Sequence, residues 1–269
     1  MRVSKNDLII NGGVHFSTLR EIKILQEIKH DNIIEMIDVF QIKNTTFIVL
    51  ELMKTDLSKI ILSKNIALSL DQIKWIMIQI LEGLKVLHKN WIMHRDLSPA
   101  NLLVSDKGEI KFSDFGLSRL FADTDRPLTK NLVTLPYRAP EILFGAVHYG
   151  PEVDIWAVGW ILAELVLKEP IFQGVNDLDQ LARIFSILGT PTDETWEGVT
   201  DLPDYVEFEE IEPEPFSNIF QSFDKNFLHL LGKLLVLNPK HRITLEEALD
   251  HSFFTEAPQP WDPLSIPLP

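Results

Sequence analysis

The sequence contains no cysteine among its 269 residues. This absence excludes a disulfide framework, a thiolate metal site and a cysteine nucleophile, and a cytosolic or nuclear protein fits. Basic residues are also scarce, because 25 Lys and Arg stand against 39 Asp and Glu, a formal charge of −14. Duplex nucleic acid and anionic membranes both require a basic face, so neither is expected as the main ligand.

Long hydrophobic runs are missing as well. The longest one, IWAVGWILAELVL at 155–167, covers 13 residues and contains Glu164, whereas a membrane-spanning helix needs about 20 apolar residues. Because this run is apolar on all sides, it predicts a helix buried in a protein core. The polar N-terminal residues MRVSKNDLII do not form a secretory signal, and the C-terminal SIPLP carries no prenylation or retention signal.

The first part of the chain combines helical and strand patterns. Residues 17–28 place leucine and isoleucine at helical spacing, with Ser17 as the expected N-cap. The segments 33–42 and 47–52 are rich in β-branched and aromatic residues and are separated by polar residues. They predict an antiparallel strand pair.

A longer helix is expected after residue 69. Ser69 and Gln72 form a capping-box pattern at its start. Its apolar face is expected to consist of Ile73, Ile76, Ile80, Leu84 and Leu87. Beyond about residue 125 the chain is predicted to be mostly helical, which places a boundary near residues 51–55. The acidic segment 207–215 is expected to be an exposed loop insertion.

The residues that point to chemistry lie between positions 94 and 116. The motif HRDLSPAN ends at Asn101, SDFG contains Asp114, and a hairpin pattern separates them. Phosphoryl transfer needs an oriented hydroxyl and divalent ions that neutralise phosphate oxygens. Asp96 can accept the hydroxyl proton, Asn101 can hold one Mg²⁺, and Asp114 can link Mg²⁺ to the β- and γ-phosphates. With APE following at 139–141, the ordered set favours a phosphotransferase over ordinary turn aspartates.

These motifs resemble those of the eukaryotic protein kinases over about residues 13–255. The resemblance implies a bilobal α+β fold with ATP and Mg²⁺ as cofactors. An incomplete, β-rich small lobe would occupy residues 1–53, a larger helical lobe 54–255, and a C-terminal tail 256–269. The resemblance also places Asp154 and Trp156 at the centre of the large lobe and pairs Glu141 with Arg242.

The segment FIVLELMKTDL at 47–57 resembles the kinase strand and hinge that contact adenine. By this likeness the backbone from Glu51 to Met53 would meet the base, Asp56 would lie near the ribose, and Leu103 would form the floor of the adenine site. Leu50 would be the gatekeeper. For the two leucines, simple core packing is the alternative interpretation.

The segment STLREIKIL at 17–25 resembles the cyclin-contacting helix of the cyclin-dependent kinases. HYG at 148–150, DLDQLARIFSILGTPT at 177–192 and LPDYVEF at 202–208 are similar to the catalytic subunit of the CDK-activating kinase in general transcription factor IIH. This implies a nuclear serine/threonine kinase whose partners are an H-type cyclin and an assembly factor. Its substrates would be the heptad-repeat tail of RNA polymerase II, the activation loops of other cyclin-dependent kinases, or both.

Thr129 lies 15 residues after Asp114, where this family places its activating phosphothreonine. Arg20, Arg95 and Arg119 match the positions that would receive the phosphate. Guanidinium groups pair well with phosphate oxygens, so this cluster would order the activation segment. The alternative is an unmodified threonine in an exposed loop.

Three features depart from the family pattern. No GxGxxG motif is present and only 20 residues precede Glu21, so the first three small-lobe strands are expected to be essentially missing. Glu21 matches the glutamate that pairs with the phosphate-anchoring lysine, for which Lys5 is the nearby candidate; otherwise Lys5 is a frayed terminal residue. Ser98 replaces a family lysine that stabilises the transferred phosphate. Pro136 replaces a tryptophan beside the substrate pocket.

Two hypotheses follow from the motifs and the departures. In the first, the chain is an active Mg²⁺-dependent serine/threonine kinase, with two alternatives for the glycine-rich loop: it lies upstream of Met1 or it is truly absent. In the second, it is a degenerate kinase fold that binds a cyclin in a transcription complex without catalysis. The presence of Asp96, Asn101 and Asp114 favours the first, because a scaffold has no chemical need for all three.

Overall fold

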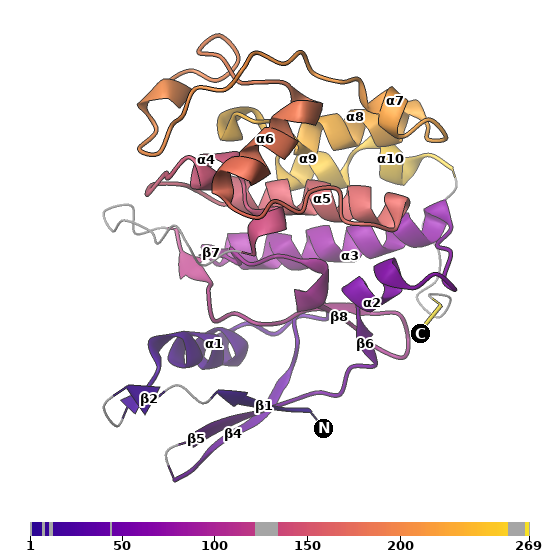
Figure 1. Cartoon of the computed structure of the whole chain (residues 1–269). Helices are drawn as coiled ribbons and strands as arrows, with labels where there is room; N and C mark the ends of the chain where they lie inside the picture. Colours follow the sequence, from indigo (N-terminus) through magenta and orange to yellow (C-terminus); the bar gives the residue numbers. More distant parts are fainter. Residues whose placement is uncertain are drawn as a thin grey trace. The chain divides into compact units, whose positions relative to one another are not determined.

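The computed structural model describes residues 2–6, 9–10, 13–43, 45–121, 134–257 and 267–268. The chain divides into two compact units, Met1–Leu120 with Pro260–Pro269 and Phe121–Gln259 (Figure 1). The division between these two units, after Leu120, does not coincide with the lobe boundary expected near residue 53. That lobe boundary stays a prediction. Among the helices of the described ranges, none has both the length and the apolar character needed to cross a membrane.

An antiparallel sheet in the order β1-β5-β4 begins the first unit. Strands β4 (Met36–Ile42) and β5 (Thr45–Leu50) confirm the predicted strand pair. Strand β1 (Arg2–Asn6) pairs with β5 along its whole length, so one strand of this sheet precedes the first helix. The expected absence of the family's first small-lobe strands and of their glycine-rich loop stays a prediction. The segment RVSKN has one apolar residue and therefore no alternation that could reveal a strand. A short hairpin of β2 (Ile9–Ile10) and β3 (Gly13–Val14) follows.

Helix α1 (Phe16–Glu27) confirms the first predicted helix, but its N-cap differs. The cap is His15, whose ring nitrogen accepts a hydrogen bond from the Ser17 backbone N–H at 3.3 Å. The prediction of Ser17 as the N-cap is wrong, because Ser17 already lies in the first helical turn, where its own backbone N–H needs a hydrogen-bond partner. Phe16 and Leu19 are 81% and 48% exposed on this helix.

A second sheet of the first unit has the order β6-β8-β9. Its strands are β6 (Thr55–Asp56), β8 (Leu102–Val104) and β9 (Ile110–Phe112), and the last two form the predicted hairpin. Helices α2 (Leu57–Leu62) and α3 (Leu70–Lys89) belong to the same unit. The capping box at the start of α3 is confirmed. All five residues predicted for its apolar face are buried.

The second unit is predominantly helical, as predicted. Its helices are α4 (Pro140–Leu143), α5 (Glu152–Leu167), α6 (Asp177–Leu188), α7 (Phe216–Ile219), α8 (Lys225–Leu234), α9 (Leu245–Leu249) and α10 (Ser252–Thr255). Helix α5 is the predicted buried helix, and both Asp154 and Trp156 lie in its buried part. Figure 1 shows α5 beside α8. Residues 209–215 are exposed and irregular, which confirms the predicted loop.

Candidate active site

Asp96 and Asn101 lie between β7 (Ile92–Met93) and β8, and a hydrogen-bonded pair forms there. Asn101 Nδ2 donates to the Asp96 backbone oxygen at 2.8 Å and to Asp96 Oδ2 at 3.1 Å. The Asp96 carboxylate is thereby held in one orientation, and no hydrogen bond from the described residues reaches Asn101 Oδ1, the acceptor atom of the same amide. Ser98 is buried, and its carbonyl accepts from the Asn101 N–H at 3.0 Å.

Asp114 follows β9 and is tied to the same loop. The backbone N–H and the hydroxyl of Ser113 both donate to the Asn101 carbonyl at 2.9 Å. Asp114 itself is exposed, and its Oδ1 accepts from the Gly116 N–H at 3.3 Å. The structure therefore brings together the three residues that the sequence predicted for catalysis.

The backbone at both aspartates is conformationally constrained. Arg95, directly before Asp96, has a φ of +67°, and Asp114 has a φ of +62°. Such left-handed conformations cost about 1–3 kcal/mol at non-glycine residues and persist where the surroundings over-determine them. Arg95 is buried, and its Nε donates to the Leu117 carbonyl at 2.8 Å. The backbone directly before Asp96 and at Asp114 is therefore left-handed, and the hydrogen bond of Arg95 helps to hold the first of these two segments.

The oxygen atoms of Asn101 and Asp114 fit a Mg²⁺ ion that is shared with a phosphate ligand. Mg²⁺ prefers oxygen ligands and usually binds through one or two protein side chains together with water and substrate phosphates. In the part of the chain that the structure describes, no group of three or more His, Cys, Asp or Glu side chains could hold a metal alone. A metal at this site would therefore depend on the nucleotide for its remaining ligands.

The residues predicted for adenine binding lie around β6 and β8. The strand register places Asp56 opposite Leu103, and Leu103 is buried. The backbone of Met53 makes no hydrogen bond with the described residues, so its polar groups are available to a base. The Glu51 carboxylate is already engaged, because Lys111 Nζ donates to its Oε1 at 2.8 Å.

Asp56 has a structural task that the sequence analysis missed. It is the N-cap of α2, and its Oδ1 accepts from the Lys59 N–H at 3.2 Å and from the Ser58 hydroxyl. Partial burial by itself would raise the pKa of Asp56, but the hydrogen bonds from Lys59 and Ser58 outweigh it and hold the pKa below its ordinary value. The signal was an aspartate directly before an apolar helical segment.

Glu21 and Lys5 lie on different elements of the first unit. Glu21 is buried in α1. Lys5 lies in β1, and its Cα is the register partner of Phe47 in β5. This position within a sheet removes the interpretation of Lys5 as a frayed terminal residue. The pairing of Lys5 with Glu21 stays a prediction.

The three predicted arginines approach one short stretch of chain. Arg20 donates to the carbonyl of residue 116 at 2.5 Å, and Arg95 donates to that of residue 117 at 2.8 Å. Arg119 lies two residues further, in β10 (Arg119–Leu120), which pairs with β7. Thr129 lies outside the described residues, so its contact with these arginines stays a prediction.

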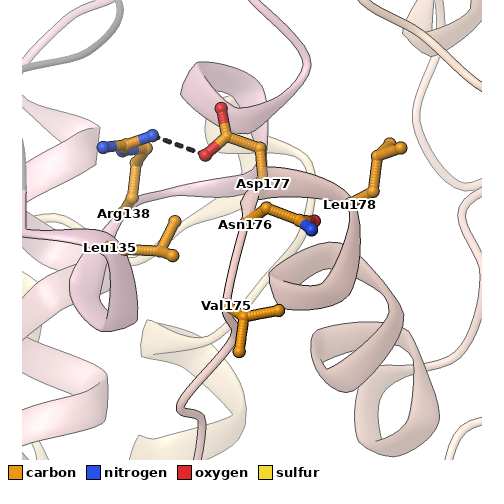
Figure 2. Close-up of a pocket in the computed structure, with 6 residues that line it drawn as sticks. All are labelled: Leu135, Arg138, Val175, Asn176, Asp177 and Leu178. Carbon is orange, nitrogen blue, oxygen red and sulfur yellow. Dashed lines mark hydrogen bonds and ion pairs between the residues drawn. The ribbon is translucent and has the colours of Figure 1, made fainter.

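The second unit contains an open pocket of about 590 Å³. Its lining residues, shown in Figure 2, are Leu135, Arg138, Val175, Asn176, Asp177 and Leu178. Arg138 donates to Asp177 Oδ1 at 2.7 Å, whereas Val175 and Leu178 are 84% and 51% exposed. Gln180 Nε2 donates to the carbonyl of Pro136 at 3.2 Å. This hydrogen bond holds the segment in which Pro136 replaces the tryptophan of the family pattern.

Comparison with known proteins identifies the family. The protein kinase domain family matches residues 7–254. Cyclin-dependent kinase 7 of Dictyostelium discoideum is 44% identical over 257 residues, covering 96% of this chain and 71% of the relative. Cyclin-dependent kinase 7 of Xenopus laevis is 46% identical, with 96% and 74% covered. Cyclin-dependent kinase D-1 of Arabidopsis thaliana is 44% identical, and the chain spans 65% of its length.

Two solved structures share the fold. The CAK complex from Chaetomium thermophilum bound to ATP-gamma-S gives a TM-score of 0.93 at 36% identity, covering 98% of this chain and 85% of that chain. The yeast RNA Pol II CTD kinase CTDK-1 complex gives 0.90 at 34% identity, with 97% and 88% covered. These findings confirm the predicted kinase fold, with a small sheet-containing N-lobe and a helical C-lobe. The chain belongs to the protein kinase family, among the serine/threonine kinases of the cyclin-dependent type that include cyclin-dependent kinase 7.

Proposed function

We propose that the chain is the catalytic subunit of an active cyclin-dependent kinase that transfers the γ-phosphate of ATP to a serine or threonine hydroxyl. The observation that carries the proposal is the linked set of Asp96, Asn101 and Asp114. Asp96 accepts the proton of the attacking hydroxyl, and Asn101 Nδ2 orients its carboxylate for that task. Asn101 Oδ1 and the Asp114 carboxylate would hold a Mg²⁺ ion, which would supply positive charge to neutralise the phosphate oxygens.

The nucleotide would bind along β6 and β8. The free backbone groups of Met53 serve the adenine edge, and buried Leu103 supports its face. Lys5, paired with Glu21, would anchor the phosphates. ATP as the nucleotide is supported by the CAK relative, which is described as bound to ATP-gamma-S.

Helix α1 is the proposed cyclin contact. Phe16 and Leu19 expose apolar surface on it, and such surface is characteristic of protein interfaces when it is contiguous. The similar solved structures are both kinase complexes. We infer an H-type cyclin and an assembly factor as partners, within transcription factor IIH, and phosphorylation of Thr129 as the event that engages Arg20, Arg95 and Arg119.

The pocket in the second unit would accept part of a protein substrate. Leu135, Val175 and Leu178 present apolar surface there, and Arg138 is fixed by Asp177. The substrates we propose are the RNA polymerase II heptad-repeat tail and the activation loops of other cyclin-dependent kinases, which places the protein in the nucleus. Immunofluorescence of the tagged protein tests that location, and exclusion from the nucleus would contradict it.

The second candidate is a kinase-fold scaffold without catalysis. Buried Ser98 favours it, because the position provides no positive charge for the transferred phosphate. A heptad-repeat peptide assay with the reconstituted cyclin complex separates the two functions. Asp96→Asn should lower kcat by about 10²–10⁴-fold, whereas Asp106→Asn, in an exposed turn, is the matched control. Equal rates for wild type and Asp96→Asn would favour the scaffold.

A further inference from the structure

Two buried amide side chains hold β9, the strand that leads to Asp114. Asn32 and Gln79 are 8% and 7% exposed. Gln79 Oε1 accepts from the Ile110 N–H at 2.9 Å, and Asn32 Nδ2 donates to the Ile110 carbonyl at 2.9 Å. Asn32 Nδ2 also lies 3.3 Å from Gln79 Oε1, to which it donates. Both backbone polar groups of one β9 residue are thus satisfied by side chains from distant segments.

The same two residues hold the chain on either side of Ile110. Gln79 Nε2 donates to the Gly108 carbonyl at 3.3 Å, and the Phe112 N–H donates to the Asn32 carbonyl at 2.8 Å. The alternate residues 108, 110 and 112 are therefore fixed along one edge, while β8 pairs with the strand on its other edge. Asp114 follows Phe112 by two residues, so little freedom remains between this anchor and the carboxylate.

Helix α3 also packs closely against Phe112 of β9 and against Asn32, at the position of Gly83. Gly83 lies one helical turn after Gln79. A Cβ atom at Gly83 would lie 2.7 Å from Phe112 Cε2 and 3.0 Å from Asn32 Cβ. The glycine therefore allows the helix to approach the strand and Asn32 this closely. Because the packing has no slack, a displacement of either amide would be transmitted to β9.

We propose that Asn32 and Gln79 are positioning residues for Asp114. They set the course of β9 and thereby place the Asp114 carboxylate relative to Asn101 Oδ1. The inference rests on the proposed kinase function, in which these oxygens bind Mg²⁺ together with ATP. Groups that orient metal ligands without touching the metal typically change metal affinity about 10–100-fold when they are removed.

The test is ATP binding by the purified chain, measured by calorimetry in Mg²⁺ and again in EDTA. The ratio of the two dissociation constants gives the gain in affinity that the metal provides. Gln79→Ala should reduce this gain about tenfold or more. The matched control is Gln180→Ala in the second unit, which likewise removes a buried glutamine; Gln180 accepts from the Gly174 N–H at 2.8 Å and donates to the Pro136 carbonyl at 3.2 Å. Its gain should equal that of wild type.

Gly83→Ala provides a second perturbation that keeps both amides. Its Cβ should displace Phe112 and also lower the gain, so it decides the question if Gln79→Ala does not fold. An unchanged gain in the folded variants would overturn the inference, as would an equal loss in Gln180→Ala, because general destabilisation would then explain the effect. A wild-type chain whose ATP binding does not respond to Mg²⁺ would instead overturn the proposed function itself.

Discussion

The ion pair between Glu141 and Arg242 leads to a sharp stability prediction. The Arg242 side chain is completely buried and the Glu141 side chain is 4% exposed. Two parallel hydrogen bonds of 2.6 Å join the guanidinium to the carboxylate. This pairing was implied by the family resemblance and is confirmed by the structure.

The magnitude follows from what remains after Glu141→Gln. Arg242 keeps its bonds to the carbonyls of residues 152, 236 and 237, and its position 5.0 Å from the Trp156 ring centroid. It loses its counter-charge, and the desolvated cation is left uncompensated. Removing one partner of a buried pair costs about 3–5 kcal/mol. At about 2–4 °C per kcal/mol, Tm should fall by roughly 6–20 °C.

Calorimetric unfolding of the wild type and of Glu141→Gln measures this fall in Tm. Arg183→Gln is the control in the same unit, because its ion pair with Asp179 is solvent-exposed and such pairs contribute little to stability. The reasoning is refuted if Glu141→Gln loses less than about 1 kcal/mol, since the guanidinium would then be compensated without the carboxylate.

Three further predictions concern separate parts of the molecule. Burial raises the pKa of Glu164 to about 7 against the opposing hydrogen bond from Tyr137. The folded state therefore binds an extra proton between pH 4.5 and 7, and stability falls as pH rises through this window, by up to about 3 kcal/mol. Urea unfolding at several pH values should show that Glu164→Gln lacks this decline; parallel pH profiles would contradict it. A Cβ at Gly159 would lie 2.6 Å from Leu235 Cδ2, so Gly159→Ala should destabilise the chain by about 1–3 kcal/mol in denaturant titrations. An unchanged denaturant midpoint would contradict this, because it would mean that Leu235 moves away from the new methyl group without loss of stability. Thr129→Ala should lower kinase activity or cyclin binding, and equal activity of the reconstituted complexes would remove Thr129 as an activating phosphosite.

Several features of this protein were determined by the sequence alone because they depend on local order. The capping box and the apolar face of α3 follow from spacings of three and four residues. The all-apolar run of α5 identified a buried helix in the same way. The order of HRD, DFG and APE identified the chemistry, because each motif combines its functional residue with the local backbone that carries it.

The tertiary structure alone decided the contacts between distant segments. Strand β1 became visible only through its pairing with β5, since its residues show no alternation. Asn32 and Gln79 are 47 positions apart, and the Arg138–Asp177 pair spans 39. No periodicity encodes such pairs, because their partners are selected by the packing that buries the apolar faces and by the need to satisfy every polar group enclosed with them.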